Sequence, residues 1–506
     1  MAVWSDLPAE LRLKIYELLD HGRRLRPQHE DVRQNHHMSA YAAVSNEWQE
    51  FFEMRNFGQL VIRQSDLQDF ERLLTKSRRC WLNTLWLQVE LPRYNCFACH
   101  LPERSWDAEI NSDVVNAAIW KLFTILSQWK GKGQKPTALN LVLSAHSPSD
   151  REHHFRDHRF DDDLLTTYSS SLVAYHHDYR HGWDHGVQLV AQEGPRRRLL
   201  GEPLKLDFNE VSADLPPRLP SLDFIVGFFI PRQFYRRFSN LELILGSLPN
   251  LKSLHLEYWR HTEPSRFGES DDVSRLRRVI QALPPSLYSF TVFRDANDAL
   301  HWGLPKAAIY ESNHDSLPTQ VLKEASYNHT IINMSFVLDA KFFFLESPRI
   351  GETSRVWPNL ESLTITSFLL SSRTMNVERD KMLIVAATTS RFMPKLRMLQ
   401  IWFTYLGKAC IFRYKNTPEG PHIEWLYTKR APKGPSPEVL ANWQMVADEK
   451  RQGQIRVEKV LISPFKGQVC KDHATIIPYL EGNVVLPSSA RQMDWEVKHV
   501  SPARAA

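Results

Sequence analysis

The residues whose types and spacing could support chemistry begin with the C-x-x-C-H run at residues 96–100. This spacing is that of c-type haem attachment, which requires an export route, and the first residues show neither the basic nor the apolar segment of a secretory signal. A zinc ion would need a second pair of ligands besides Cys96 and Cys99. Only Cys80 and His100 lie near enough in sequence to add to them. We therefore expect this run to be a surface loop that carries two thiols.

Two groups of histidines occur in the polar stretch of residues 147–201. His177, His181 and His185 are spaced by four residues, and on a helix they would share one face and could bind a metal. Gly182 interrupts that helix. The second group consists of His153, His154 and His158 with Asp161, Asp162 and Asp163. We expect both groups to be solvated loop, so no catalytic residue, cofactor or metal ligand is assigned.

The composition limits the class of protein. The chain has 506 residues, of which 42% are hydrophobic and 24% charged, so it predicts several globular domains or a repeat array. A net charge of +5 over this length does not indicate nucleic-acid binding. No apolar stretch approaches a membrane span, and five cysteines are too few for a disulfide scaffold. These features favour the cytosol or the nucleus.

A short pattern, apolar-x-x-apolar-x-apolar, recurs along the chain. It occurs at residues 82–87, 138–143, 251–256, 287–292, 331–336, 360–365 and 396–401. This resembles an irregular leucine-rich repeat, in which each unit is a strand followed by a helix and stacked units bury a common core. The spacing predicts an α/β strand–helix solenoid over residues 61–405, with the polar stretch at 147–201 as a partly mobile insertion. The alternative is an ordinary α/β domain with several similar strands.

Helical periodicity appears between these motifs, at residues 114–129, 273–282 and 377–392. A further strand is predicted at 222–230. The polar positions within the motifs are expected to face an open concave surface that binds a partner. They include Gln88, His255, Glu257, Thr291, Thr364, Thr366, Gln400 and Phe403.

The last hundred residues lack the recurring apolar motif and show a different order of predicted elements. Strands are predicted at 410–414, 423–427 and 457–462, and a helix at 435–449. We interpret residues 406–506 as a small α/β cap with a disordered tail.

The first sixty residues predict two helices. Leu7, Leu11, Ile15, Leu18 and Leu19 form one apolar stripe, which we expect to end at Gly22. A second stripe follows over residues 41–52, with Ser39 as a suitable cap.

The residues of this module resemble a known pattern. Leu7-Pro8-x-Glu10 with Ile15 and Leu18-Leu19, followed by Val44-Ser45-x-x-Trp48 and Phe57-x-x-Leu60, is similar to the F-box, and the chain looks like the large F-box proteins of filamentous fungi. The resemblance implies that residues 1–60 dock the Skp-type adaptor of a cullin–RING ubiquitin ligase. The residues implicated in that contact are Leu7, Pro8, Leu11, Ile15, Leu18, Val44 and Trp48.

The resemblance also implies a function without bond chemistry of its own. The chain would recruit an unknown target protein to the ligase, and neither an enzyme activity, a nucleic acid nor a membrane enters this hypothesis. Two alternatives remain open. One is an interaction scaffold outside any ligase, in which residues 1–60 only cap the repeats. The other is a metal-dependent enzyme that uses the histidine-rich insertion.

Overall fold

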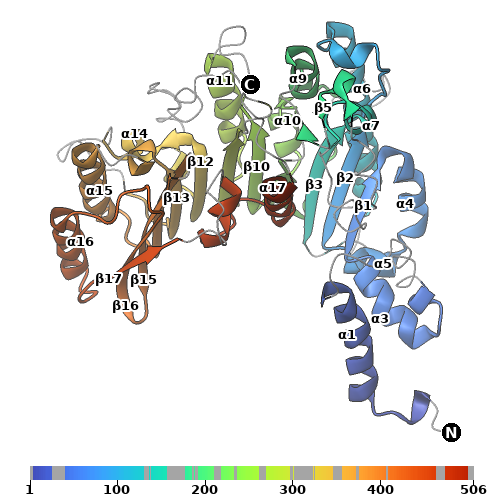
Figure 1. Ribbon diagram of the computed structural model, residues 1–506. Coiled ribbons are helices and arrows are strands. Elements are labelled where there is room, and N and C mark those ends of the chain that lie inside the picture. Colours follow the sequence, from blue (N-terminus) through green and yellow to red (C-terminus); the bar gives the residue numbers. More distant parts are fainter. Residues whose placement is uncertain are drawn as a thin grey trace.

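A computed structural model describes most of the chain. The described residues are 4–25, 40–129, 136, 138–156, 177–184, 187–188, 192–209, 218–232, 236–260, 269–296, 300, 323, 325–345, 356–371, 375–405, 408–462 and 473–499. Within them the protein is a mixed α/β structure built on one sheet of twelve strands, most of which are parallel. Figure 1 shows this sheet following an arch, with the N-terminal helices projecting from one end.

The large sheet begins with a long parallel series. In spatial order the strands are β1 (Gln59–Arg63), β2 (Thr84–Glu90), β3 (Leu139–His146), β8 (Ile225–Ile230), β10 (Ser253–Trp259), β11 (Ser289–Asp295), β12 (Ile331–Asp339), β13 (Ser362–Thr366) and β14 (Met398–Tyr405). Then β15 (Lys408–Thr417) and β16 (Gly420–Tyr427) pair antiparallel, and β17 (Arg456–Leu461) is parallel to β16. The two small sheets consist of β4 (His177–Asp178), β5 (Trp183–Asp184) and β6 (Val187–Gln188), and of β7 (Leu204–Lys205) with β9 (Phe238–Ser239).

Helices such as α6 (Ser105–Ser127), α11 (Glu269–Gln281), α15 (Asn376–Ser390) and α16 (Pro437–Glu449) cover one face of the large sheet. The other α-helices described are α1 (Ala9–Leu25), α3 (Asn46–Asn56), α4 (Leu67–Leu73), α5 (Lys76–Trp81), α7 (Pro148–Glu152), α9 (Glu193–Leu200), α10 (Glu242–Leu245), α14 (Ala340–Leu345) and α17 (Pro487–His499). The 3-10 helices are η1 (Trp4–Asp6), η3 (Gln64–Asp66), η4 (Ala98–His100), η6 (Tyr179–His181), η7 (Phe368–Ser371), η8 (His473–Thr475) and η9 (Ile477–Tyr479).

The strand register aligns apolar side chains into rows that face these helices. Leu254 of β10 lies beside Phe290 of β11, which lies beside Ile332 of β12, and all three are fully buried. Side chains from α6, α11, α15 and α16 join the same hydrophobic core. Because side chains alternate in direction along a strand, the positions between these rows point to the opposite face of the sheet.

Most of the predicted elements are confirmed. Each of the seven apolar motifs contributes a strand of the large sheet, and the predicted helices at 114–129, 273–282 and 377–392 correspond to α6, α11 and α15. The predicted strands and helix after residue 406 correspond to β15, β16, β17 and α16. Strand β14 pairs with β15 along the whole length of β14, so the sheet continues without a break into this region.

Two boundaries in the N-terminal region were predicted wrongly. Helix α1 continues past Gly22 to Leu25, so that glycine does not end it. Helix α3 begins at Asn46 instead of running from residue 41, because Ser45 is extended and its hydroxyl accepts a hydrogen bond from the Trp48 N–H, at 3.4 Å. An N-cap of this kind starts a new helix, and Ser39 lies outside the described residues.

Among the described residues, no helix combines the length and the apolar character that crossing a bilayer would need.

Helix α16 offers a test of how its region packs on the sheet. The Trp443 side chain is fully buried, and its ring lies 4.6 Å from that of Tyr414 and 5.5 Å from that of Phe412. We expect Trp443→Ala to lower the free energy of unfolding by about 3–5 kcal/mol, measured by urea unfolding, because it leaves a large cavity. Met445→Ala on the exposed side of the same helix is the control and should have little effect. Equal effects of the two variants would contradict this packing.

Candidate functional site

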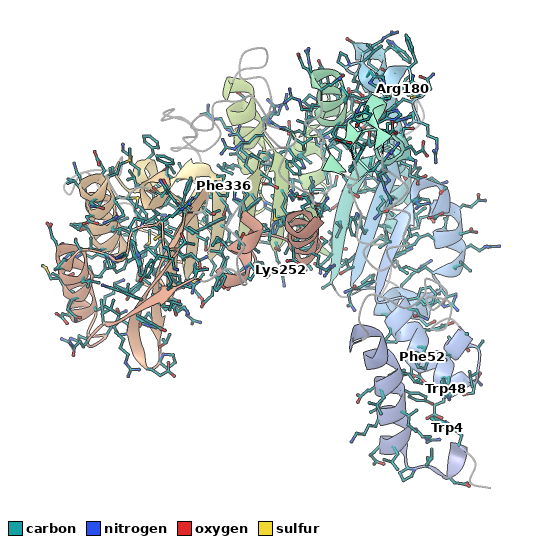
Figure 2. The ribbon with its side chains drawn as sticks, viewed as in Figure 1. Trp4, Trp48, Phe52, Arg180, Lys252 and Phe336 are labelled. Atoms are coloured by element: carbon teal, nitrogen blue, oxygen red, sulfur yellow. The ribbon has the colours of Figure 1, made fainter. Side chains whose placement is uncertain are left out.

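The N-terminal module, residues 4–56, is held together by aromatic packing. Tyr16 of α1 and Phe52 of α3 are buried, and the rings of Trp4 and Trp48 pack beside them. Ring centroids lie 5.0 Å apart for Tyr16 and Trp48 and 5.2 Å apart for Trp4 and Trp48. Figure 2 shows Trp4, Trp48 and Phe52 gathered in this module, away from the large sheet. Trp48, which was predicted as an adaptor contact, is partly buried and packs against this small core.

An ion pair joins this module to helix α5, which lies between the first two strands in sequence. The Arg78 guanidinium of α5 donates to both carboxylate oxygens of Glu53, at 3.0 and 2.5 Å. The hydrogen bonds from Arg78 lower the pKa of the Glu53 carboxyl, against the opposing effect of burial. The Arg78 guanidinium also lies over the ring of Phe57, 4.7 Å from its centroid. The module is thereby fastened at the edge where β1 begins.

The other residues predicted to contact the adaptor lie on helix α1, just before it, or just before α3. Leu11 and Leu18 are 49% and 65% exposed, and Val44, which precedes α3, is 60% exposed. Ile15 and Leu7 are half-buried, and Pro8 is exposed. Leu11, Ile15 and Leu18 follow one another at four and three residues and so share one face of the helix. We call this face, with Val44, the N-terminal apolar face.

The opposite face of the large sheet from the helices is crossed by a row of polar side chains. From β10 to β16 the residues in register are His255, Thr291, Asn333, Thr364, Gln400, Arg413 and Glu424. Neighbouring side chains of this row are hydrogen-bonded to one another. The Asn333 side-chain amide donates to the Thr291 hydroxyl at 3.1 Å, and the Arg413 guanidinium donates to the side-chain oxygen of Gln400 at 2.7 Å. We call this the polar row.

The C-terminal segment, residues 473–499, covers the polar row. The Gln400 amide donates to the Glu481 carbonyl at 3.3 Å and its side-chain oxygen accepts from the Glu481 N–H at 3.1 Å. The Asn333 amide donates to the Asn483 carbonyl at 3.4 Å. Increasing residue number along the segment thus leads back across the sheet, from β14 towards β10, and Figure 1 shows α17 on the inner side of the arch.

The segment ends at a buried charged centre. Glu257 of β10 is fully buried, and it accepts hydrogen bonds from the Leu486 N–H and the Ser489 hydroxyl of the segment. Arg232, after β8, donates to both carboxylate oxygens of Glu496 on α17, at 2.8 and 2.7 Å. The same guanidinium pairs with the buried carboxylate of Asp295. Each of these charges has a partner of opposite sign or a backbone donor, as burial requires.

The prediction of an open concave surface was wrong for the eight positions named from the sequence. All of them are buried: Gln88, His255, Glu257, Thr291, Thr364, Thr366, Gln400 and Phe403. For several of them the reason is that the chain's own C-terminal segment occupies the face. The periodicity of single strands could not predict this, because the covering residues lie far away in sequence, 232 positions in the case of Glu257 and Ser489.

A cluster of cysteine and histidine side chains lies at the carboxyl ends of β2 and β3. Cys96 and Cys99 follow β2, His153 follows β3, and His181 belongs to η6. The Cys96 Sγ lies 3.1 Å from the His181 Nε2, and the His153 Nδ1 lies 3.3 Å from the same nitrogen. His100 and His154 adjoin this group, with ring centroids 5.0 Å apart. Figure 2 labels Arg180, the neighbour of His181, at the opposite end of the strands from the N-terminal module.

The expectation that these residues are solvated was wrong for three of them, while Cys96, His100 and His153 are half-buried. Cys99, His154 and His181 are buried, and residues 177–184 form two short strands and a 3-10 turn instead of a helix. Burial and the neighbouring Cys96 thiol raise the pKa of Cys99 to about 11, and burial with the nearby histidines lowers the pKa of His154 to about 4. His158, His185 and residues 161–163 lie outside the described residues, as does the His177 side chain.

One signal in the sequence could have predicted part of this cluster. Adjacent parallel strands end at the same edge of a sheet, and the motifs at 82–87 and 138–143 form the adjacent strands β2 and β3. Cys96 and Cys99 follow the first motif at almost the same offset as His153 follows the second. Ligands that are close in sequence do not include His153 and His181, so the second pair was not predicted.

Comparison with known proteins gives one partial match. Residues 282–485 match a family of unknown function (DUF6546). This is less than half of the chain, and it includes the strands from β11 to β17 and the first part of the C-terminal segment. The match does not reach the N-terminal module or the cysteine–histidine cluster. No match was found among curated proteins.

Removing a carboxylate from the buried charged centre should destabilise the protein more than removing one from the surface. In Glu496→Ala the Arg232 side chain, only 2% exposed, would lose one of its two carboxylate partners. We expect the free energy of unfolding to fall by about 3 kcal/mol and hydrogen exchange to rise in residues 473–499, because a buried charge loses compensation. Glu449→Ala removes an exposed ion pair with Arg391 and should cost less than about 1 kcal/mol. If exchange in the segment is unchanged in Glu496→Ala, the segment does not depend on this centre.

Proposed function

We propose that this protein is a substrate-recruiting subunit of a cullin–RING ubiquitin ligase, in which the N-terminal module is an F-box that docks a Skp-type adaptor. The observation that carries the proposal is the N-terminal apolar face, where Leu11, Leu18 and Val44 are exposed although the module already has an aromatic core of its own. Exposed apolar side chains that share one face of a helix, as Leu11 and Leu18 do, are typical of a surface that binds a partner.

The arrangement of the module supports docking through that face. The aromatic residues hold α1 against α3, and the Glu53–Arg78 pair holds α3 against helix α5. The apolar face therefore lies on a helix whose position is fixed. Docking would then bury leucine and valine side chains against an apolar groove of the adaptor. Trp48 would contribute indirectly in this arrangement, because it positions α1 through its contacts with Trp4 and Tyr16.

We further propose that the strand–helix units are irregular leucine-rich repeats and that they bind the target protein. The C-terminal segment covers the middle of the sheet, so the target would contact the parts of the repeat region that remain accessible. On β17, at the far edge of the sheet from the N-terminal module, Val457 and Leu461 are 41% and 46% exposed. In such a ligase the chain acts by bringing its target close to the ubiquitin-bearing partner.

An interaction scaffold outside any ligase is the second candidate, and one observation favours it. Helix α3 packs near β1, which is the edge strand of the large sheet, and the Glu53–Arg78 pair secures it there. Edge strands and terminal repeats commonly need a cap. In this alternative the module would stabilise the array, and its apolar face would have no adaptor to bind.

The two candidates predict different results for a surface variant. We expect the double variant Leu11→Asp, Leu18→Asp to lose co-purification with a co-expressed Skp-type adaptor, because two charges would enter an apolar interface. The unfolding midpoint should stay close to that of the unmodified chain, since both side chains are exposed.

Leu73→Asp is the matched control, because Leu73 is 47% exposed on α4, outside the module. It should retain the adaptor. The ligase proposal fails if the unmodified chain does not retain the adaptor, or if the double variant retains it as well as the control does.

A further inference from the structure

We propose that Cys96, Cys99, His153 and His181 bind one zinc ion in a closed, structural site. This inference is independent of the ligase proposal, because the site lies at the other end of the strands from the N-terminal module (Figure 2).

The geometry of the four side chains fits a single ion. One ligand atom from each residue lies within 4.8 Å of each of the others. In a tetrahedral zinc site with bonds of 2.0–2.3 Å, neighbouring ligand atoms are separated by about 3.3–3.8 Å. The distances from the His181 Nε2 to the Cys96 Sγ and the His153 Nδ1, 3.1 and 3.3 Å, are already close to that range.

The ligand types select the metal. Two thiols and two imidazoles form the Cys₂His₂ set of structural zinc sites, and the spacing of Cys96 and Cys99 is the common C-x-x-C. Magnesium and calcium prefer oxygen ligands, and the set contains none. Four protein ligands also leave no open position for water or a substrate, so the site would be structural and not catalytic.

The surroundings of His181 provide an independent indication. Its Nδ1 lies 2.8 Å from the Asp178 carboxylate, and Arg156 pairs with the same carboxylate. A carboxylate that accepts the Nδ1 proton leaves the Nε2 lone pair directed at the thiol of Cys96 and the ring of His153. Metal-binding histidines are commonly oriented by a carboxylate in this way. The ring of His153 is fixed as well, since it stacks on that of Tyr94 at 5.6 Å.

A zinc ion here would connect three segments that the sequence separates. Cys96 and Cys99 lie in the connection between β2 and α6, His153 follows α7, and His181 belongs to η6. Both histidines lie in the polar stretch of residues 147–201. That stretch has few apolar residues of its own. Ligation would therefore supply binding energy that hydrophobic burial does not, as structural zinc does in other small units.

A second set of cysteine and histidine side chains lies beside the first and offers another possible position for the ion. Cys99, His100 and His154 also converge, but they provide three ligands and share Cys99 with the first set. The four-residue set completes a tetrahedron and the three-residue set does not. Variants of His100 and His154 therefore distinguish the two sites.

The test is metal analysis of the full-length, untagged chain purified without chelators. We expect about one zinc per chain, and its replacement by cobalt(II) should give the absorption of a tetrahedral, thiolate-bound ion. Cys96→Ser and His181→Ala should lose the zinc, whereas Cys80→Ser, which changes an exposed cysteine outside the cluster, should keep it. Asp178→Asn should retain the four ligands but lower the zinc affinity about 10–100-fold.

Chelation of the unmodified chain separates loss of metal from misfolding of a variant. We expect hydrogen exchange to rise in residues 92–104 and 148–156 and to stay unchanged in 408–461, with recovery on adding zinc. The proposal is overturned if the freshly reduced chain contains and takes up no zinc, if it forms a Cys96–Cys99 disulfide in place of binding metal, or if Cys96→Ser keeps the ion. Loss of zinc in His154→Ala together with retention in His153→Ala would place the metal in the other set and would also overturn it.

Discussion

The structure depends on how one face of a parallel sheet satisfies its polar side chains. The strands that bury leucine, isoleucine and phenylalanine against the helices place Asn333, Gln400 and Glu257 on the other face. Polar groups that are removed from water need hydrogen-bond partners, and a charge needs them most. The C-terminal segment supplies those partners through its backbone and through Ser489 and Glu496. The sheet and the segment are therefore one structural unit, although they lie far apart in sequence.

This arrangement divides the surface of the protein into parts with different roles. The middle of the inner face is occupied by the chain itself and is not available for a partner. The N-terminal module presents leucine and valine side chains at one end of the strands, and the cysteine–histidine cluster gathers at the other end. In the proposed function the first end binds the ligase, and the zinc site would give the second end a fixed shape.

Local pattern was enough to predict most strands of the large sheet and several helices, because one motif alternates with the period of a strand and α6, α11 and α15 follow the period of a helix. Pattern also identified the residues that now form the N-terminal apolar face. It could not show that the Trp48 ring packs against Trp4 and Tyr16, because a helical stripe does not reveal which neighbouring element covers it. It missed the covered polar row and the second pair of cluster ligands, because Glu496 with Arg232, and His181 with Cys96, meet only through tertiary structure.

The central claim is that the N-terminal apolar face is where this protein meets a ligase adaptor. Hydrogen exchange of the full-length chain, measured alone and with a saturating Skp-type adaptor, tests it most directly. The account predicts protection in residues 7–25 and 40–56 and no change in residues 473–499, because the segment is already buried on the sheet. Protection absent from the N-terminal residues, or found along the sheet or the C-terminal segment instead, would contradict it.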